Sequence, residues 1–339
     1  MRKVFVSGAT GFIGQHLVND LVKREVSVRC LVRPRSETQR IDHPSVEITP
    51  GQLDDVEQLR SAISGCDTVF HLAGQTYAVR NEEMYHTNGR LTGLVAEACR
   101  KQPNPPRLIF SSSLAAAGPT LHNTVRDESE PPTPISVYGK SKRQGEIEIE
   151  RRAADVPCTI IRPGAVFGPF DRAILLMFQS VYRYRLHVVA GFRTPPLSLI
   201  YVSDLVDLMI RCAVDGECVA ASKNDEYSPQ GYYVASDDSE FPTLWQLGPR
   251  IARACDRRFV FVWPLWRWVA RTAAVTNQGF VRLRGKATRF NVDKVNEGCV
   301  ASWASSAAKA RTQLGFNPDA DLDSRLRETA EWYLANNWL

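Results

Sequence analysis

The 339-residue chain has no strong excess of either charge, because 42 Lys and Arg stand against 37 Asp and Glu. A formal charge of +5 is mild for this length, and we find no basic stripe of the kind that binds nucleic acid, so no nucleic-acid partner is expected. Internal repeats and low-complexity tracts are also absent. The apolar residues at the N-terminus are interrupted from Ser7 to Gly11, which is not the pattern of a signal peptide.

Cysteine pairs with metal-ligand spacing are missing as well. The eight cysteines contain no C-x-x-C pair, and most stand among apolar neighbours. We therefore expect free, buried thiols in a reducing cytoplasm, with neither disulfides nor a bound metal. What remains is an ordinary globular composition, 44% hydrophobic and 23% charged, in a chain long enough for one large core or two smaller ones.

Short apolar runs and helix-period segments alternate regularly through the first half of the chain. The expected strands are Lys3–Val6, Ser27–Val32, Val46–Thr49, Thr68–Leu72, Leu108–Ser111 and Thr159–Arg162. The expected helices include Val56–Ile63, Glu82–Arg100 and Ser136–Ala154. This alternation predicts an α/β fold with a doubly wound, Rossmann-like parallel sheet over residues 1–165. Such sheets bind ligands at the carboxyl ends of their strands.

After residue 165 the alternation loosens, and Pro, Gly and aromatic residues become common. The expected elements are strands at Leu197–Val202 and Tyr232–Ala235 and helices at Ser203–Ala213, Thr243–Cys255 and Leu322–Tyr333. Residues 166–339 are therefore predicted to form mainly a smaller, mixed α/β substrate-binding lobe, with some segments returning to the sheet domain.

Three glycines follow the first expected strand, at Gly8, Gly11 and Gly14, and an amphipathic helix begins there. Glycines allow a tight turn and a close approach of the backbone to a ligand, and a helix N-terminus suits a pyrophosphate. The spacing is G-x-x-G-x-x-G instead of the dinucleotide fingerprint G-x-G-x-x-G. A tight strand–helix turn without a ligand is the alternative, but the position after the first strand favours a cofactor site.

A tyrosine and a lysine four residues apart, Tyr138 and Lys142, open the expected helix Ser136–Ala154. The pKa of a free tyrosine is about 10, and a nearby ammonium group is expected to lower it, so that Tyr138 can transfer a proton. Upstream, an expected strand ends in Ser111–Ser113, where a hydroxyl could bind the same substrate oxygen. An incidental pair on a surface helix, and serines that merely end a strand, are the alternatives.

Five motifs in order carry a resemblance: Ser7-Gly-Ala-Thr-Gly-Phe-Ile-Gly14, His71-Leu-Ala-Gly74, Asn88, Ser111–Ser113 and Tyr138-Gly-Lys-Ser-Lys142. Together they resemble the extended short-chain dehydrogenase/reductase family, also called the NAD-dependent epimerase/dehydratase family. Weaker echoes continue at Arg162-Pro163, Phe167-Gly-Pro169, Tyr201-Val-Ser-Asp204 and Leu314-Gly-Phe-Asn-Pro318.

The resemblance implies a role for each matching residue. Tyr138 is expected to be the catalytic acid or base, Lys142 to hold the nicotinamide ribose and tune Tyr138, and Ser113 to be the catalytic serine. Asn88 corresponds to an asparagine that organises backbone and water. The expected cofactor-binding residues are Gly8, Thr10, Gly11, Phe12, Ile13, Gly14, Arg33, Arg35, Ser36, Gln52, Leu53, Leu72, Ala73, Gly74, Asn88, Ser111, Tyr138, Lys142 and Pro163.

The end of the second expected strand indicates which dinucleotide is bound. Family members that use NAD usually have Asp or Glu there, whereas this chain has Arg33, Arg35 and Ser36. Guanidinium groups match phosphate oxygens, so we expect NADP(H) in preference to NAD(H), with a solvated basic loop as the alternative. Gln52 replaces the usual Asp of the family and could still accept a hydrogen bond from the adenine amino group.

The residues around the expected site discriminate among the family's reactions. Ser113 is followed by Leu114-Ala-Ala116 instead of the Asp-Glu pair of dehydratases, and Ile161–Gly168 resembles reductases and steroid dehydrogenases. We therefore expect an oxidoreductase that interconverts a secondary alcohol and a ketone. The alternatives are a nucleotide-sugar epimerase, with Arg183, Arg185 and Arg193 as diphosphate ligands, and a non-catalytic dinucleotide sensor or scaffold.

An aromatic run at 259–275 contains Trp263, Trp266 and Trp268 but is too short and too interrupted by Pro264, Arg267 and Arg271 to span a bilayer. Core packing in the lobe is the favoured interpretation. The alternatives are an apolar wall for a steroid- or terpenoid-like substrate and a shallow membrane-surface contact. A homodimer through helices Glu82–Arg100 and Ser136–Ala154 is expected from the resemblance.

Overall fold

The computed structural model describes residues 1–121, 124–221, 227–284, 288 and 292–339. Its centre is a seven-stranded sheet in which every neighbouring pair is parallel, in the order β10-β6-β5-β4-β1-β2-β3. The strands are β1 (Lys3–Ser7), β2 (Ser27–Val32), β3 (Val46–Pro50), β4 (Thr68–His71), β5 (Arg107–Ser111), β6 (Cys158–Pro163) and β10 (Tyr232–Ala235). The predicted α/β fold with a Rossmann-like parallel sheet is confirmed, and the first six strands lie within a residue or two of the predicted bounds.

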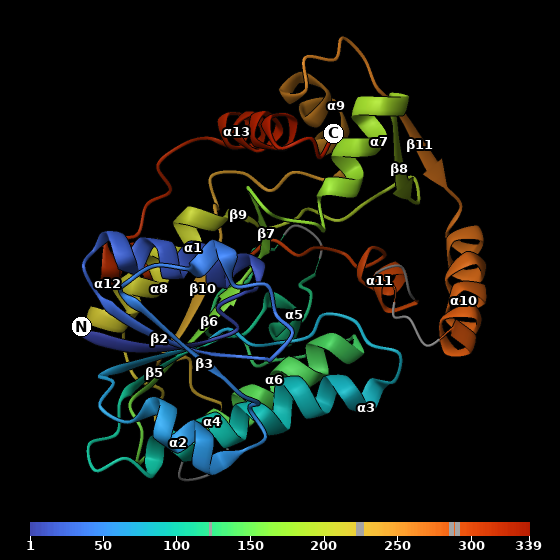
Figure 1. Cartoon of the computed structure of the whole chain (residues 1–339). Helices are drawn as coiled ribbons and strands as arrows, with labels where there is room; N and C mark the ends of the chain where they lie inside the picture. The colour runs from blue at the N-terminus through green and yellow to red at the C-terminus, as the bar shows by residue number, and fades with distance from the viewer. Residues whose placement is uncertain (122–123, 222–226, 285–287, 289–291) are drawn as a thin grey trace.

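Helices cover both faces of the sheet (Figure 1). One layer contains α1 (Phe12–Lys23), α8 (Val202–Asp215) and α12 (Ala308–Leu314), and the other contains α2 (Val56–Ile63), α4 (Leu91–Arg100) and α6 (Val137–Glu150). Successive side chains of a strand point to opposite faces, so Val4 and Val6 enter one hydrophobic core and Phe5 enters the other. Six of the eight cysteines are buried, and none of the eight forms a disulfide.

The strands β1 and β4 are neighbours in the sheet, and the strand order reverses between them: β2 and β3 follow on one side, and β5 and β6 on the other. Parallel sheets of this kind bind ligands in the crevice at such a reversal. The glycine turn between β1 and α1 therefore lies where a ligand is expected. On the far edge, β10 pairs with β6 after more than sixty intervening residues, so the chain returns to the sheet from the lobe.

The predicted helix Glu82–Arg100 exists as three consecutive pieces. These are α3 (Asn81–Met84), a π-helical segment η2 (Tyr85–Arg90) and α4. A π-helical turn holds one extra residue in the helix and is frequent at functional sites. Asn88 lies in this segment and is fully buried.

The lobe lies beyond the carboxyl edge of the sheet (Figure 1). Its strands are β7 (Ala165–Phe167), β8 (Leu186–Ala190), β9 (Leu199–Tyr201) and β11 (Phe261–Leu265), and its helices are α7 (Leu175–Tyr184), α9 (Leu244–Ala254) and α13 (Leu322–Ala335). The strands form two-stranded parallel sheets, β7 with β9 and β8 with β11. Phe178, Leu247, Ile251 and Tyr333 contribute to a third hydrophobic core.

Two helices extend from the lobe along the side of the molecule. The helix α10 (Arg267–Arg284) stands at the outer edge, and α11 (Val292–Glu297) lies between α10 and the elements α5 (Leu114–Ala117) and α6 (Figure 1). The small cluster of Ala274 and Val295 joins α10 to α11. The chain then continues into α12, which packs on α8 of the sheet domain.

Candidate active site

The glycine turn after β1 is a cradle that a side chain would fill. Gly8 has φ +77°, and a Cβ atom on it would lie 2.6 Å from the backbone nitrogen of Ala73. A Cβ on Gly14 would collide with the carbonyl oxygen of Gly8. Gly11 precedes α1 and provides no side-chain cap, so the N–H groups of the first turn are offered to a ligand. The turn fits a dinucleotide pyrophosphate, which backbone N–H groups and the helix N-terminus would hold.

The predicted residues Leu72, Ala73, Gly74 and Asn88 form the neighbouring wall of this cradle. The Leu72 backbone N–H donates to the carbonyl of Ser7, 3.1 Å away, which ties the segment to β1. A Cβ atom on Gly74 would lie 3.2 Å from Asn88 Oδ1 and 3.7 Å from Lys142 Nζ. The fold therefore brings the glycine turn, Gly74, Asn88 and Lys142 to one place.

Asn88 organises the backbone at this wall. Its Oδ1 accepts from the Gln75 N–H at 2.8 Å, and its Nδ2 donates to the Gln75 carbonyl at 2.8 Å and to Ser141 Oγ at 2.8 Å. These bonds join the π-helical segment to the loop after β4 and to α6. In this structure Asn88 therefore holds three segments of the chain together.

Lys142 is buried, and its ammonium group is directed at the end of β5. Nζ donates to the Ser111 carbonyl at 2.5 Å and lies 4.4 Å from the centroid of the Phe110 ring. Burial lowers the pKa of Lys142 to about 7, against an opposing attraction from Glu146. Lys142 therefore stands near the point where it gains or loses a proton at neutral pH.

Tyr138 lies in the first turn of α6, which Ser136 caps by accepting from the Gly139 N–H at 3.0 Å. Burial raises the pKa of Tyr138 to about 12, although hydrogen bonding to the Ser113 side chain lowers it. The expected lowering of the Tyr138 pKa by Lys142 is not found in this structure, in which the Lys142 ammonium group donates to the Ser111 carbonyl. Ser113 also caps α5, its Oγ accepting from the Ala115 N–H at 3.2 Å. Ser113 and Tyr138 thus lie together.

A buried ion pair that the sequence analysis missed supports this helix. Arg162 of β6 donates to both carboxylate oxygens of Glu146 at 2.9 and 2.8 Å, and Ser112 Oγ donates to the same carboxylate at 2.6 Å. Both charged side chains are almost completely buried. The pair fixes α6 against β5 and β6 one turn beyond Lys142. Arg162 is an arginine in an otherwise apolar strand, but no local pattern in the sequence identifies its partner.

The residues expected at the adenosine end follow β2 and β3. Arg33, Arg35 and Gln52 are all exposed. The two arginines follow β2 and Gln52 follows β3, and the last residues of these strands, Val32 and Pro50, are register partners. The Ser36 N–H donates to the Arg33 carbonyl at 2.9 Å, which makes a turn there. This end of the sheet lies on the β2 side of β1, away from Ser113 and Tyr138 on the β5 side.

The other predicted cofactor residues are distributed as follows. Thr10 accepts from Gln15 Nε2 at 2.9 Å through its carbonyl, and Phe12 and Ile13 begin α1, where Ile13 packs against the core. Leu53 packs against the second core, and Pro163 is buried at the carboxyl end of β6. No local signal separates residues that would touch a cofactor from those that only shape the turn.

The helix α11 reaches across the active-site helix. Asp293 Oδ2 accepts from the Val137 N–H at 2.8 Å, and Lys294 Nζ lies 5.7 Å from the centroid of the Tyr138 ring. The charge of Glu297 also raises the pKa of Tyr138. These contacts join residues more than 150 positions apart, so sequence patterns could not reveal them.

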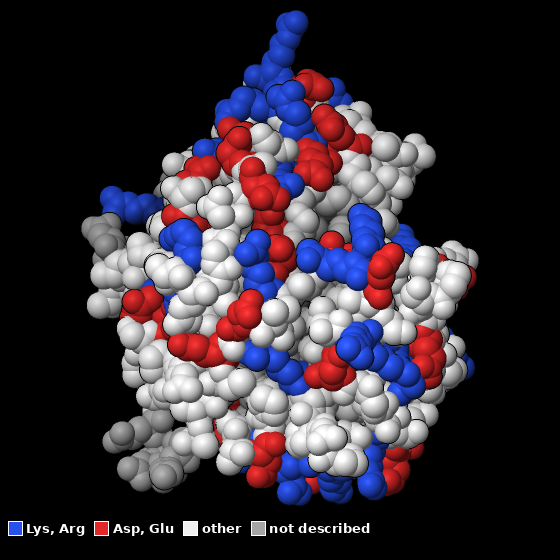
Figure 2. Space-filling model, turned by 90° about the vertical axis from the view of Figure 1, so that its left-hand side faces the viewer, with Lys and Arg blue, Asp and Glu red and all other residues white. Residues whose placement is uncertain are grey.

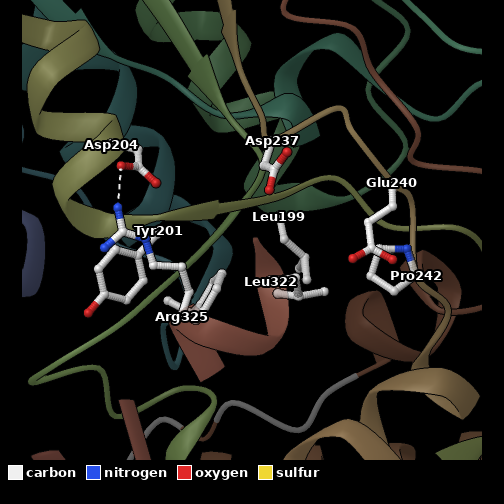
Figure 3. Close-up of a pocket in the computed structure, with 9 residues that line it drawn as sticks. Leu199, Tyr201, Asp204, Asp237, Glu240, Pro242, Leu322 and Arg325 are labelled. Atoms are coloured by element: carbon white, nitrogen blue, oxygen red, sulfur yellow. Dashed lines mark hydrogen bonds and ion pairs between the residues drawn. The ribbon is translucent and has the colours of Figure 1, made fainter. Parts of the chain in front are cut away.

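A separate small pocket lies between β9 and the C-terminal helix α13. Figure 3 shows the ion pair of Asp204 and Arg325, 2.9 Å apart, on one side and Glu240 on the other. Its volume of about 10 Å³ is at the lower limit for one water molecule. None of the predicted site residues lines it.

Comparisons with known proteins identify one family and one fold. The model of the family described as "NAD dependent epimerase/dehydratase family" matches residues 4–221. A ceramide reductase of Caulobacter vibrioides is 27% identical over 337 residues, which cover 99% of this chain and 96% of that protein. A 3 beta-hydroxysteroid dehydrogenase/Delta 5-->4-isomerase of Mycobacterium tuberculosis is 25% identical over 353 residues, covering 99% and 91%. The solved UDP-glucose 4-epimerase of Thermotoga maritima has the same fold, with a TM-score of 0.76, 20% identity and 99% coverage of both chains.

Proposed function

We infer the reaction from the premise that the chain belongs to the NAD-dependent epimerase/dehydratase family and is an NAD(P)-dependent enzyme of the extended short-chain dehydrogenase/reductase type. We propose that it interconverts a secondary alcohol and a ketone on a hydrophobic, lipid-like substrate. The observation that supports this most is the convergence of Ser113, Tyr138 and Lys142 beside the glycine turn and Gly74.

The chain's own residues divide the proton and positioning work. Tyr138 donates the proton to the ketone oxygen, or removes it from the alcohol, and Ser113 hydrogen-bonds the same oxygen. Lys142, whose Nζ lies near Gly74 and the end of β5, would hold the ribose next to the reacting ring of the dinucleotide. The bound dinucleotide supplies or accepts the hydride. Ser111, Asn88 and the ion pair of Glu146 with Arg162 hold these groups in position.

The substrate class is proposed from the named activities of the two full-length relatives. One is a ceramide reductase and the other acts on a 3 beta-hydroxysteroid, so both names describe oxidoreductases of lipid-like molecules. The sequence around the serine argues against dehydration, because Leu114-Ala-Ala116 follows Ser113 and offers no acid for that reaction.

We also propose that the dinucleotide is NADP(H). Arg33 and Arg35 stand exposed just after β2, and Ser36 adds a hydroxyl in the same turn. A cationic fork in this position attracts a 2′-phosphate, whereas an acidic residue would repel it. Substitution of Arg33 and Arg35 by Ser should weaken NADPH binding at least tenfold and leave NADH binding nearly unchanged, as titration of the nicotinamide fluorescence would measure.

An epimerase that uses the same site is the alternative, supported by the fold shared with the UDP-glucose 4-epimerase. Such an enzyme keeps its dinucleotide through the reaction, so the purified protein would absorb as a dinucleotide complex and catalyse no net oxidation. A non-catalytic sensor would bind NADP(H) but turn over neither alcohols, ketones nor sugars.

The test of the oxidoreductase is turnover of a 3β-hydroxysteroid and of a keto-ceramide, followed through the absorbance of reduced nicotinamide. Tyr138→Phe should reduce turnover about 10²- to 10⁴-fold, the usual range for loss of a general acid or base, while dinucleotide binding persists. Tyr85→Phe, which changes an exposed tyrosine of the π-helical segment, is the matched control and should keep full activity. Full turnover by Tyr138→Phe would refute the mechanism.

A further inference from the structure

The strand β11 presents its aromatic side chains to solvent and its smaller ones to the lobe. Phe259, Phe261 and Trp263 alternate along the chain and are 68%, 57% and 52% exposed, whereas Val260 and Val262 between them are partly covered. A strand with one covered face normally turns its larger apolar residues inward. The predicted core packing of this run is therefore wrong for its aromatic residues.

The exposed apolar surface continues beyond β11 on both sides. Val188 of β8 is the register partner of Trp263 and is itself 45% exposed. The Phe192 ring, in the turn after β8, contacts Trp266 with 5.4 Å between centroids. On α10, Trp268 and Val275 are exposed and seven residues apart, so they share one helix face. We call residues 257–284 the aromatic arm.

The charge of this region is of one sign. Residues 257–292 contain eight Lys and Arg and no Asp or Glu. Arg258, Arg267 and Arg271 are exposed among the aromatic side chains. On the opposite side of the molecule, by contrast, blue and red side chains are interspersed over most of the surface (Figure 2). The aromatic arm thus combines exposed aromatic side chains with arginines and contains no acidic residue.

We propose that the aromatic arm docks the protein on an anionic lipid bilayer. Trp and Phe side chains lie favourably at the boundary between lipid headgroups and acyl chains, and arginines beside them attract anionic headgroups. Within the described ranges no helix is long and apolar enough to cross a membrane, so the contact is with one surface. A second copy of this chain would bring like charges together, which favours the bilayer as the occupant.

The arm is joined directly to the active site. Ala274 of α10 packs on Val295 of α11, and α11 places Asp293 on the Val137 N–H and Lys294 over the Tyr138 ring. Docking therefore holds Tyr138 one short helix away from the membrane surface. Resting on the proposed function, this arrangement makes the substrate an amphiphile that is resident in that membrane and whose reacting carbon lies near the headgroups.

The experiment is sedimentation of the full-length protein with vesicles of phosphatidylcholine, with and without phosphatidylglycerol. The wild type should bind the anionic vesicles, and high salt should weaken binding because it screens the arginines. The variants Arg267→Glu with Arg271→Glu, and Trp266→Ser with Trp268→Ser, should each bind at least tenfold more weakly. The double variant Lys23→Glu with Lys101→Glu changes the same net charge at exposed sites on α1 and beside α4, and should bind like the wild type.

Failure of the wild type to bind anionic vesicles would overturn the proposal, as would equal loss in the Lys23 and Lys101 control. So would arm variants that leave vesicle binding unchanged but convert an oligomer to a monomer in size-exclusion chromatography, which would make a second copy the occupant. Tyr138→Phe should bind vesicles normally. The arm variants should thus lose vesicle binding, and Tyr138→Phe should lose turnover of dispersed steroid. Each proposal can therefore fail without the other.

Discussion

Two regions of this molecule depart from the rule that charged groups lie outside and apolar groups inside. Around α6, Lys142, Glu146, Arg162 and the nearby His71 are buried, yet each has hydrogen-bonding partners within the chain. In the aromatic arm, large apolar side chains are exposed, and no other residue of the described ranges covers their outer faces. The first departure is compensated internally, whereas the second is compensated only by a surface outside the chain. Buried charges thus indicate an internal network of partners, and exposed apolar side chains indicate a partner outside the chain.

The largest effect is expected from breaking the buried ion pair. Glu146→Ala should lower the free energy of unfolding by about 3–5 kcal/mol, because it leaves the Arg162 guanidinium buried without its counter-charge. Glu148→Ala, on the same helix but partly exposed and paired with Arg151 and Arg152, should cost about 1 kcal/mol or less. Urea unfolding measures both. Equal losses would mean that the α6 region is not held by its buried charges.

The next effect depends on pH and tests the buried histidine. Ser7 Oγ and Thr92 Oγ1 bind the two ring nitrogens of His71, and burial lowers the pKa of His71 to about 3. The unfolded chain then binds more protons between about pH 6.5 and pH 3, so stability falls as the pH is lowered through this window. At about pH 4.5 this contribution amounts to about 2–3 kcal/mol.

His71→Gln removes the titrating group and should make the fall in stability between pH 7 and about pH 4.5 shallower by about that amount. The exposed His86→Gln serves as the control and should leave the fall unchanged. Thermal unfolding over this pH range is the measurement. An identical slope in the His71 variant would show that its burial is not maintained in solution.

The smallest effect is expected in the aromatic arm. Trp266→Ser with Trp268→Ser should change the free energy of unfolding by no more than about 1 kcal/mol, because both side chains are more than half exposed. Phe178→Ala in the core of the lobe should cost about 3–5 kcal/mol by comparison. A loss in the tryptophan variant as large as that of Phe178→Ala would place the arm inside the fold and remove the contrast between the two regions.

The parts of the molecule that the sequence predicts well depend on short-range patterns. Gly8, Gly11 and Gly14 mark a turn by their spacing, and the alternation of apolar runs gives the first six strands within a residue or two. The partners of buried charges cannot be predicted from short-range patterns. Glu146 and Arg162 meet only because α6 packs on the sheet. The period of two in Phe259, Phe261 and Trp263 is typical of a strand, but it does not show which face of that strand the lobe covers.

The return of β10 to the sheet has a consequence for how the enzyme can be divided. The chain leaves the sheet after β6, comes back for α8 and β10, leaves again for α9 to α11, and returns once more for α12. Residues 1–165 contain the glycine turn and both Tyr138 and Lys142, but alone they would leave β6 as an open edge and one face of the sheet stripped of α8 and α12. The two halves are interwoven rather than concatenated, so we expect that neither could be exchanged between relatives as a cassette.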